Sequence, residues 1–126
     1  MMGDMNRKLT LILFAVLLVA AGPKPRIARV WHGQVPASRG DEYEKYLKEA
    51  GISKLRAIPR NMGVQMFRRE VGDRSDFVVI SYWPSLDAIH AYAGADISKV
   101  HFLPRDKEFL IEPEAEVRHY EIKVQE

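Results

Sequence analysis

The stretch from residue 77 to residue 104 constrains the fold more than any other part of this 126-residue chain. Residues 77–83 (FVVISYW) form a short apolar run, which is typical of a strand. The dipeptide Pro84-Ser85 interrupts the run, because proline cannot donate to a strand ladder and serine favours the position before a helix. Residues 86–93 then predict a helix that ends at Gly94. We expect Leu86, Ile89 and Ala93 of this helix to face inward. Tyr92 should lie near the same edge.

Before this stretch the sequence predicts a strand, a helix and a second strand. Residues 27–35 (IARVWHGQV) alternate loosely in polarity and read as a strand. Residues 41–50 place apolar side chains three and four positions apart, which predicts a helix capped by Ser38 and ended by Gly51. Residues 63–70 predict another strand, and a polar turn joins it to the next one as a hairpin.

After the central stretch the pattern is weaker. We expect Asp96 to cap a short helix that carries Val100 and His101. Residues 104–110 predict one further helical turn, and residues 116–124 (EVRHYEIKV) predict the last strand. The order is therefore strand, helix, strand, strand, helix, strand.

This order predicts an α+β, ferredoxin-like βαββαβ fold with a four-stranded antiparallel sheet. Right-handed crossovers place both helices on one face of the sheet. The other face is left open, although the strands carry large apolar residues on both faces, such as Val30 beside Trp31. We therefore expect a homodimer in which the open faces of two sheets meet, as in a dimeric α+β barrel.

Charge and residue types exclude several classes of site. The net charge is +2 with both signs scattered, so a clustered basic face for nucleic acid is not expected. The absence of cysteine removes disulfides, thiolate metal sites and cysteine nucleophiles. The sequence also lacks a glycine-rich phosphate loop and a nucleophile elbow. We expect no metal site.

The N-terminus predicts export. Residues 9–21 are almost wholly apolar, follow a short basic lead and end in small residues, which is typical of a signal peptide. We expect cleavage after Ala21, a linker over residues 22–26 and one domain over residues 27–126, in a periplasmic or secreted protein. The alternatives are an uncleaved membrane anchor, which would be the only membrane contact, and a core helix.

Several segments together resemble the antibiotic biosynthesis monooxygenase family of dimeric α+β barrels. The resemblance covers residues 27–124 and is moderately specific for the fold, but weakly specific for the reaction. The residues that carry it are Tyr82-Trp83-Pro84-Ser85, Ala88-Ile89, Tyr92-Ala93-Gly94, Asp96-Ile97, Pro104, Asp106, Phe109-Leu110 and Val117-Arg118-His119-Tyr120-Glu121.

The resemblance implies a pocket between the helices and the concave face of the sheet, which holds an electron-rich aromatic substrate. The family includes monooxygenases that act on polyketide anthrones without a metal, enzymes that degrade haem, and members with no demonstrated activity. Tyr92 falls where the haem degraders carry a tryptophan, and His101 falls within about one residue of their axial histidine. Trp31 or His32 stands where they carry an asparagine.

The candidate site residues are aromatic or basic. His101 is the candidate catalytic base, since imidazole titrates near neutral pH. Arg29 and Arg68 could each polarise a substrate carbonyl or form a surface ion pair. His32 and His119 could form a cross-strand pair, and His90 is expected in solvent. The residues predicted to bind substrate are Trp31, Arg68, Trp83, Tyr92 and Phe102.

The function predicted from these residues and this resemblance is cofactor-independent oxidation of a small aromatic or quinol-type substrate. One alternative is a non-catalytic ligand-binding or stress-related dimeric module. The other is a protein that binds or degrades haem through His101, in which case haem would be the cofactor.

Overall fold

The computed structural model describes residues 22–126, and the predicted signal segment lies outside the described residues. Within residues 22–126, no helix combines the length and apolar character that a membrane span requires. The elements are β1 (Ile27–Pro36), η1 (Ala37–Arg39), α2 (Gly40–Tyr46), η2 (Leu47–Ile52), α3 (Ser53–Ala57), β2 (Gly63–Val71), β3 (Arg74–Trp83), α4 (Leu86–Ala93), α5 (Asp106–Phe109) and β4 (Arg118–Glu121).

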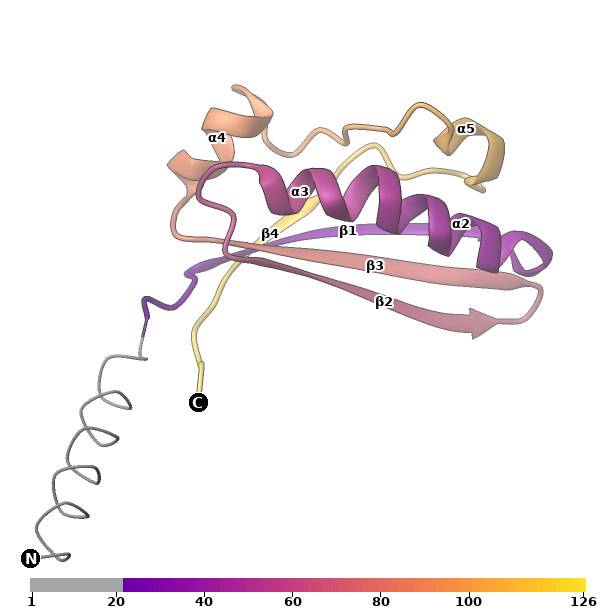
Figure 1. Ribbon diagram of the computed structural model, residues 1–126, viewed down its shortest axis with the longest axis horizontal. Helices are drawn as coiled ribbons and strands as arrows, with labels where there is room; N and C mark the ends of the chain where they lie inside the picture. Colours follow the sequence, from indigo (N-terminus) through magenta and orange to yellow (C-terminus); the bar gives the residue numbers. More distant parts are fainter. Residues whose placement is uncertain (1–21) are drawn as a thin grey trace, which may run out of the picture.

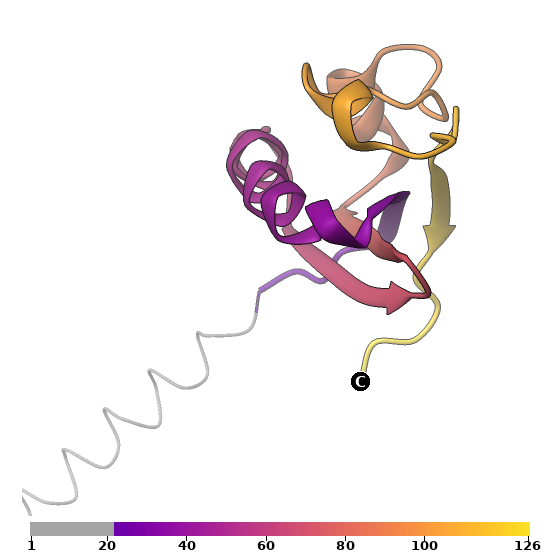
Figure 2. The ribbon, with the colours of Figure 1, turned by 90° about the vertical axis from the view of Figure 1, so that its right-hand side faces the viewer.

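The four strands form one antiparallel sheet in the order β2-β3-β1-β4. The helices lie together on one side of this sheet (Figure 1), and the view turned by 90° shows the α2–α3 rod beside the α4 and α5 segments (Figure 2). The predicted ferredoxin-like α+β fold is therefore confirmed. The long β2–β3 hairpin turns at Gly72, whose φ of +60° suits glycine.

The core lies between the helices and the inner face of the sheet. Alternate residues of β1 and β3 point to this face, because side chains alternate along a strand. One cluster lies under α2 and α5 and is formed by Val35, Tyr43, Leu47, Phe77, Val79 and Phe109. A second lies under α4 and is formed by Ile27, Trp83, Ala88, Ile89 and Ala93.

The first helix is longer than the sequence pattern predicts. Its backbone stays helical from residue 40 to residue 57 through a π-helical segment, η2, so the predicted end at Gly51 is wrong. Gly51 is buried, and a Cβ there would lie 3.1 Å from Leu47 Cδ1 and 3.3 Å from Leu103 Cδ1. Glycine is therefore used for close packing. Ser38 lies within η1 and makes no capping hydrogen bond.

The second helix begins and ends as predicted. Ser85 Oγ accepts from the backbone N–H of Ala88, and Gly94 ends α4 with a φ of +84°. The predicted inward position of Leu86 is wrong, because this side chain is 45% exposed and Ala88 takes the buried position.

The segment after α4 is extended instead of helical. Lys99 bridges to Glu116, and the backbone N–H of Val100 donates to the carbonyl of Ala115. This pairing uses backbone groups that a helix would need, so the predicted short helix carrying His101 is wrong. Asp96 accepts a hydrogen bond from Ser98 Oγ. The last strand, β4, is also shorter than predicted.

The outer face of the sheet is not covered by any segment of residues 22–126 (Figures 1 and 2). Phe67 is 46% exposed and Tyr120 is 54% exposed on this face. Val30 and Ile80 lie opposite each other at its centre and are only partly buried. These apolar side chains are therefore accessible on the open face.

Candidate functional site

A cavity of about 280 Å³ lies between the α2–α3 helix and the inner face of the sheet. The segment 101–104 crosses its mouth. Its wall is mostly aromatic or aliphatic, with a few polar groups. The aromatic and polar side chains in the lining include Arg29, Trp31, Tyr43, Ser81, Tyr92 and His101.

Arg29 lies at the floor of this cavity and is only 6% exposed. Its Nη1 donates to the carbonyl of Ile97 and to Nε2 of His119, which is 2.8 Å away. Its guanidinium carbon lies 5.7 Å from the centre of the Tyr92 ring. Burial lowers the pKa of Arg29 from its usual value, although the pKa of an arginine stays far above neutrality. Among the described residues no carboxylate pairs with it, so the predicted surface ion pair is wrong.

An aromatic series leads from the core to the mouth. Trp83 is fully buried, and its Nε1 donates to Ser81 Oγ at 2.9 Å. The Tyr92 ring stacks on Trp83 and lies in the cavity wall. The His101 ring follows, with its centre 5.9 Å from that of Tyr92. Trp83 therefore supports the Tyr92 ring from the core side, and Tyr92 contacts the exposed His101 ring.

A buried phenol and carboxyl lie at the other end of the cavity. Tyr43 donates its hydroxyl to Asp106 Oδ1 at 3.0 Å, and the backbone N–H of Leu103 donates to Oδ2 at 2.8 Å. Burial raises the pKa of Asp106, and it also raises the pKa of Tyr43, with the charge of Asp106 adding to that effect. This pair anchors the segment that crosses the mouth.

Four of the six predicted site residues line the cavity: Trp31, Tyr92, His101 and Phe102. His101 and Phe102 are exposed at its mouth, while Trp31 is half-buried in its wall. Trp83 lies behind the wall and acts through Tyr92.

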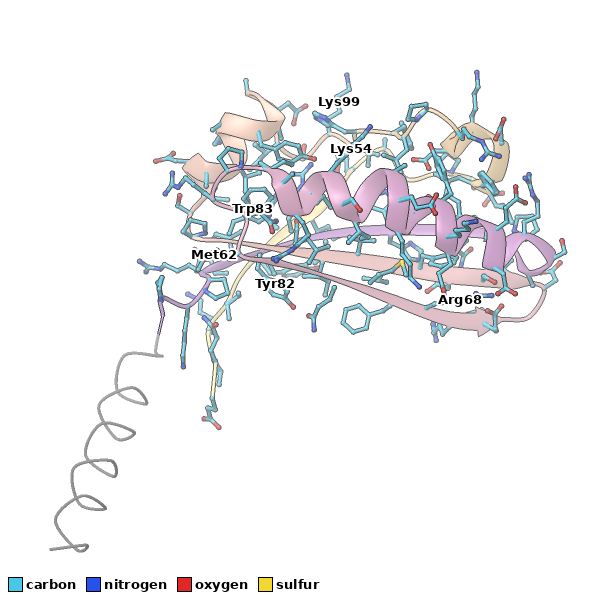
Figure 3. The ribbon with its side chains drawn as sticks, in the orientation of Figure 1. Lys54, Met62, Arg68, Tyr82, Trp83 and Lys99 are labelled. Carbon is cyan, nitrogen blue, oxygen red and sulfur yellow. The ribbon has the colours of Figure 1, made fainter. Side chains whose placement is uncertain are left out.

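Arg68, which the sequence predicts to bind substrate, does not line the cavity. It lies toward the end of the sheet away from Trp83 (Figure 3). Its guanidinium contacts Asp41 and Glu70, each at 2.8 Å, and lies over the Phe77 ring at 5.5 Å. One acidic neighbour from a distant helix, Asp41, and one from the same strand, Glu70, therefore give Arg68 a structural role.

His32 and His119 do not meet, because they project from opposite faces of the sheet. His32 lies on the open face, with Nε2 2.5 Å from Asp76 and Nδ1 3.2 Å from Glu114. His119 lies on the inner face beside Arg29. The predicted cross-strand pair is therefore wrong. His90 is exposed, as predicted, and contacts the carbonyl of Gly94.

Sequence reasoning missed four polar cavity residues: Tyr43, Lys54, Ser81 and Asp106. A signal for Ser81 was present, since a serine inside the apolar run 77–83 shares a face with Trp83. Tyr43 and Asp106 are 63 positions apart, and no local pattern joins them.

Comparisons with known proteins support the fold alone. No family model matches the sequence, and no curated protein matches it. Among solved structures, the chain is similar to MhuD of Mycobacterium tuberculosis, a haem degrader solved with two haems bound in its active site. The identity is 20%, the TM-score is 0.54, and the match covers 79% of this chain and 97% of that one.

The cavity residues do not fit haem. The volume of about 280 Å³ lies just below the roughly 300–1,000 Å³ range of small-molecule pockets, so the cavity is small for a porphyrin. The His101 ring forms no hydrogen bond with a described residue, whereas metal-binding histidines are held through their other ring nitrogen. A metal ion held by protein ligands alone is a separate question, and within residues 22–126 no cluster of three or more histidine or acidic side chains could hold one.

Proposed function

We propose that this protein is a monooxygenase of the antibiotic biosynthesis type, which oxidises a small, electron-rich aromatic or quinol-type substrate without a cofactor. The observation that carries the proposal is the cavity itself. Its walls place Trp31 and Tyr92 where flat rings can stack on a flat substrate, with an imidazole at the mouth. The shared fold supports the same choice of family.

His101 would act as the base. An activated CH₂ group beside an aromatic carbonyl loses one proton to the imidazole, and the resulting carbanion takes up O₂. The peroxide anion formed in this way takes the proton back from the imidazole and becomes a hydroperoxide. The hydroperoxide then loses water, so that CH₂ becomes C=O and the second oxygen atom leaves in the water. A positioned base of this kind contributes about 10²- to 10⁴-fold to the rate.

Oxygen uptake with anthrone- and quinol-type substrates tests the proposal. We expect uptake above the protein-free control, and we expect His101→Gln to reduce it by about 100-fold or more. His90→Gln is the matched control, because His90 is also an exposed histidine but does not line the cavity. Uptake equal to the protein-free control would favour the non-catalytic binding module instead.

Titration with hemin separates the haem alternative. Because the cavity is small and His101 is not anchored, we expect no Soret shift that depends on His101. A shift that is present in the native protein and lost in His101→Ala would establish haem binding and contradict our reading of the cavity.

We also propose that two copies associate through the open faces of their sheets. The support is the apolar surface around Val30, Phe67 and Ile80, which the described chain leaves uncovered. A shared interface would bury this surface and provide the hydrophobic contribution to stability that one small domain lacks.

Export remains part of the proposal. The composition of residues 9–21 supports a signal peptide that is cleaved after Ala21. Mass spectrometry of the protein isolated from its native host should give an N-terminus at Gly22. Retention of residues 1–21 in the membrane fraction would indicate an anchor instead.

A further inference from the structure

We propose that Arg29 and Ser81 form an anion-binding subsite at the cavity floor, so that the ligand is an aromatic compound carrying an ionised oxygen. The inference rests on the proposed function and names the substrate class of the same cavity. The ionised oxygen could belong to a carboxylate or to a phenolate, since both present the same negative acceptor to a guanidinium.

Arg29 has N–H donors that no described residue uses. A guanidinium has five N–H donors, and here only Nη1 has partners among the described residues. The Nε and Nη2 groups form no hydrogen bond with residues 22–126, yet neither is fully sealed from open space. Because Arg29 lines the cavity, these donors are available to a ligand there.

The positive charge of Arg29 has no negative partner among the described residues. The partners of Nη1 are a carbonyl and an imidazole, and neither neutralises the guanidinium. The pKa of His119 is lowered, by burial first and then by the charges of Arg29 and His90, so this imidazole is neutral at neutral pH. An unpaired buried cation is costly, and an anion that enters the cavity removes much of that cost.

The other charged side chains in the lining do not compete with a ligand anion for Arg29. Among residues 22–126, Asp106 is the only acidic side chain in the lining, and Tyr43 and the Leu103 N–H already occupy its two oxygens. Burial raises the pKa of Asp106, so its charged form is disfavoured. Lys54 adds a second cation to the lining. The cavity is therefore electropositive.

Ser81 supplies a second donor. It pairs directly with Arg29 across strands β1 and β3, so both side chains point to the inner face. Ser81 is 2% exposed, and its oxygen accepts from Trp83 Nε1. Its hydroxyl hydrogen has no acceptor among the described residues, so it can be donated to the same ligand oxygen as the Arg29 N–H groups.

Binding of paired naphthalene compounds tests the subsite. The probes are 2-naphthoate and its neutral analogue 2-naphthamide, and the measurement is calorimetric titration of the whole protein near neutral pH. We expect the carboxylate to bind at least about 10-fold more tightly than the amide, since it forms charge-assisted hydrogen bonds. Arg29→Met should abolish this preference, and Arg29→Lys should retain part of it.

Arg56→Met is the matched control. Arg56 is an exposed arginine on α3 that does not line the cavity, so its loss changes net charge equally but should leave the preference unchanged. Equal loss in Arg56→Met and Arg29→Met would mean that net charge alone sets the preference, which would overturn the subsite. Circular dichroism establishes that each variant is folded. If Arg29→Met does not fold, the wild-type ratio and Arg29→Lys decide the question.

A second probe, 2-naphthol, distinguishes the source of the anion. A subsite for phenolate lowers the pKa of the bound naphthol, which its absorbance reports, and Arg29→Met should remove the shift. Carboxylate preference without this shift assigns the subsite to carboxylates, and the shift without the preference assigns it to phenolates. If neither appears, the proposal is wrong.

Failure of this proposal differs from failure of the oxygenase proposal. Anion preference without oxygen uptake would retain the subsite and reject the enzyme. Oxygen uptake with equal affinity for 2-naphthoate and 2-naphthamide, and with no shift in the pKa of bound 2-naphthol, would retain the enzyme and reject the subsite.

Discussion

The rings of Trp83 and Tyr92 lie nearly parallel, with planes 5° apart and centres 5.6 Å apart. Trp83 closes strand β3 and is fully buried, while Tyr92 belongs to α4 and forms part of the cavity wall. This stack joins the core to the candidate site across the Pro84-Ser85 break. The position of the cavity wall therefore depends on a residue that does not touch the cavity.

Trp83→Ala should destabilise the fold by about 3–5 kcal/mol, because a large buried side chain leaves a void. Tyr92→Phe should change stability by less than about 0.5 kcal/mol, since the Tyr92 hydroxyl bonds to no described residue and the stack is kept. Urea unfolding followed by far-ultraviolet circular dichroism measures both. Equal effects of the two substitutions would contradict the role assigned to Trp83.

The His32–Asp76 pair should make stability depend on pH. Burial opposes the charging of His32, but its hydrogen bond to Asp76 and the charges of Asp76 and Glu114 outweigh burial and raise its pKa. Burial alone would raise the pKa of Asp76, but hydrogen bonds from His32 and Gln34 lower it. The contribution of His32 to the free energy of unfolding is therefore complete below its unfolded pKa of about 6.5. It disappears as pH rises through the raised pKa of His32 in the folded state.

The contribution of Asp76 to the free energy of unfolding is lost at low pH instead of high pH. It is present above the unfolded pKa of about 4 and disappears as pH falls through the lowered value. His32→Gln should therefore cost about 1 kcal/mol near pH 5.5 and less near pH 9, with the partial exposure of His32 limiting the effect. Urea unfolding of both proteins at the two pH values measures the difference, and His90→Gln serves as the control. A cost independent of pH would show that the charge of His32 does not stabilise the fold.

Gly33→Ala should displace the indole of Trp31. A Cβ at position 33 would lie 2.6 Å from Trp31 Cη2 and 3.0 Å from Leu110 Cδ2, so one of these side chains must move. We expect a loss of about 1–3 kcal/mol in the free energy of unfolding, with weaker binding of naphthalene probes because Trp31 lines the cavity. Calorimetric titration and urea unfolding test the two effects, and unchanged values of both would contradict the packing described for Gly33.

Ile80→Asp should separate the proposed dimer. Ile80 lies at the centre of the open sheet face, where a charge opposes burial against a second copy. Sedimentation equilibrium of the exported protein should give a mass near twice that of one chain, and the variant should give the mass of one chain. Leu86→Asp is the control, since this side chain is exposed on α4. A monomeric wild-type protein would exclude the shared interface.

The order of strands and helices could be predicted because it depends on local patterns. Alternation along residues 27–35, the proline after Trp83 and the serine cap of α4 each act within a few residues. The predicted end of the first helix at Gly51 failed for a different reason. Gly51 lies inside the continuous helix, and Leu103, some fifty positions later in the chain, packs close to it, so the glycine allows close packing and does not end the helix.

The polar chemistry of the site depended on the tertiary structure. Arg29 and Arg68 both lie on strands beside apolar residues, and the sequence treats them alike. Folding brings Asp41 and Glu44 to Arg68, which also pairs with Glu70 on its own strand, whereas Arg29 receives a carbonyl and a neutral imidazole at a cavity floor. Periodicity sets which face of an element is buried, because it acts over one or two turns. Whether a buried charge finds a partner depends on contacts between distant segments, which only the complete fold brings together.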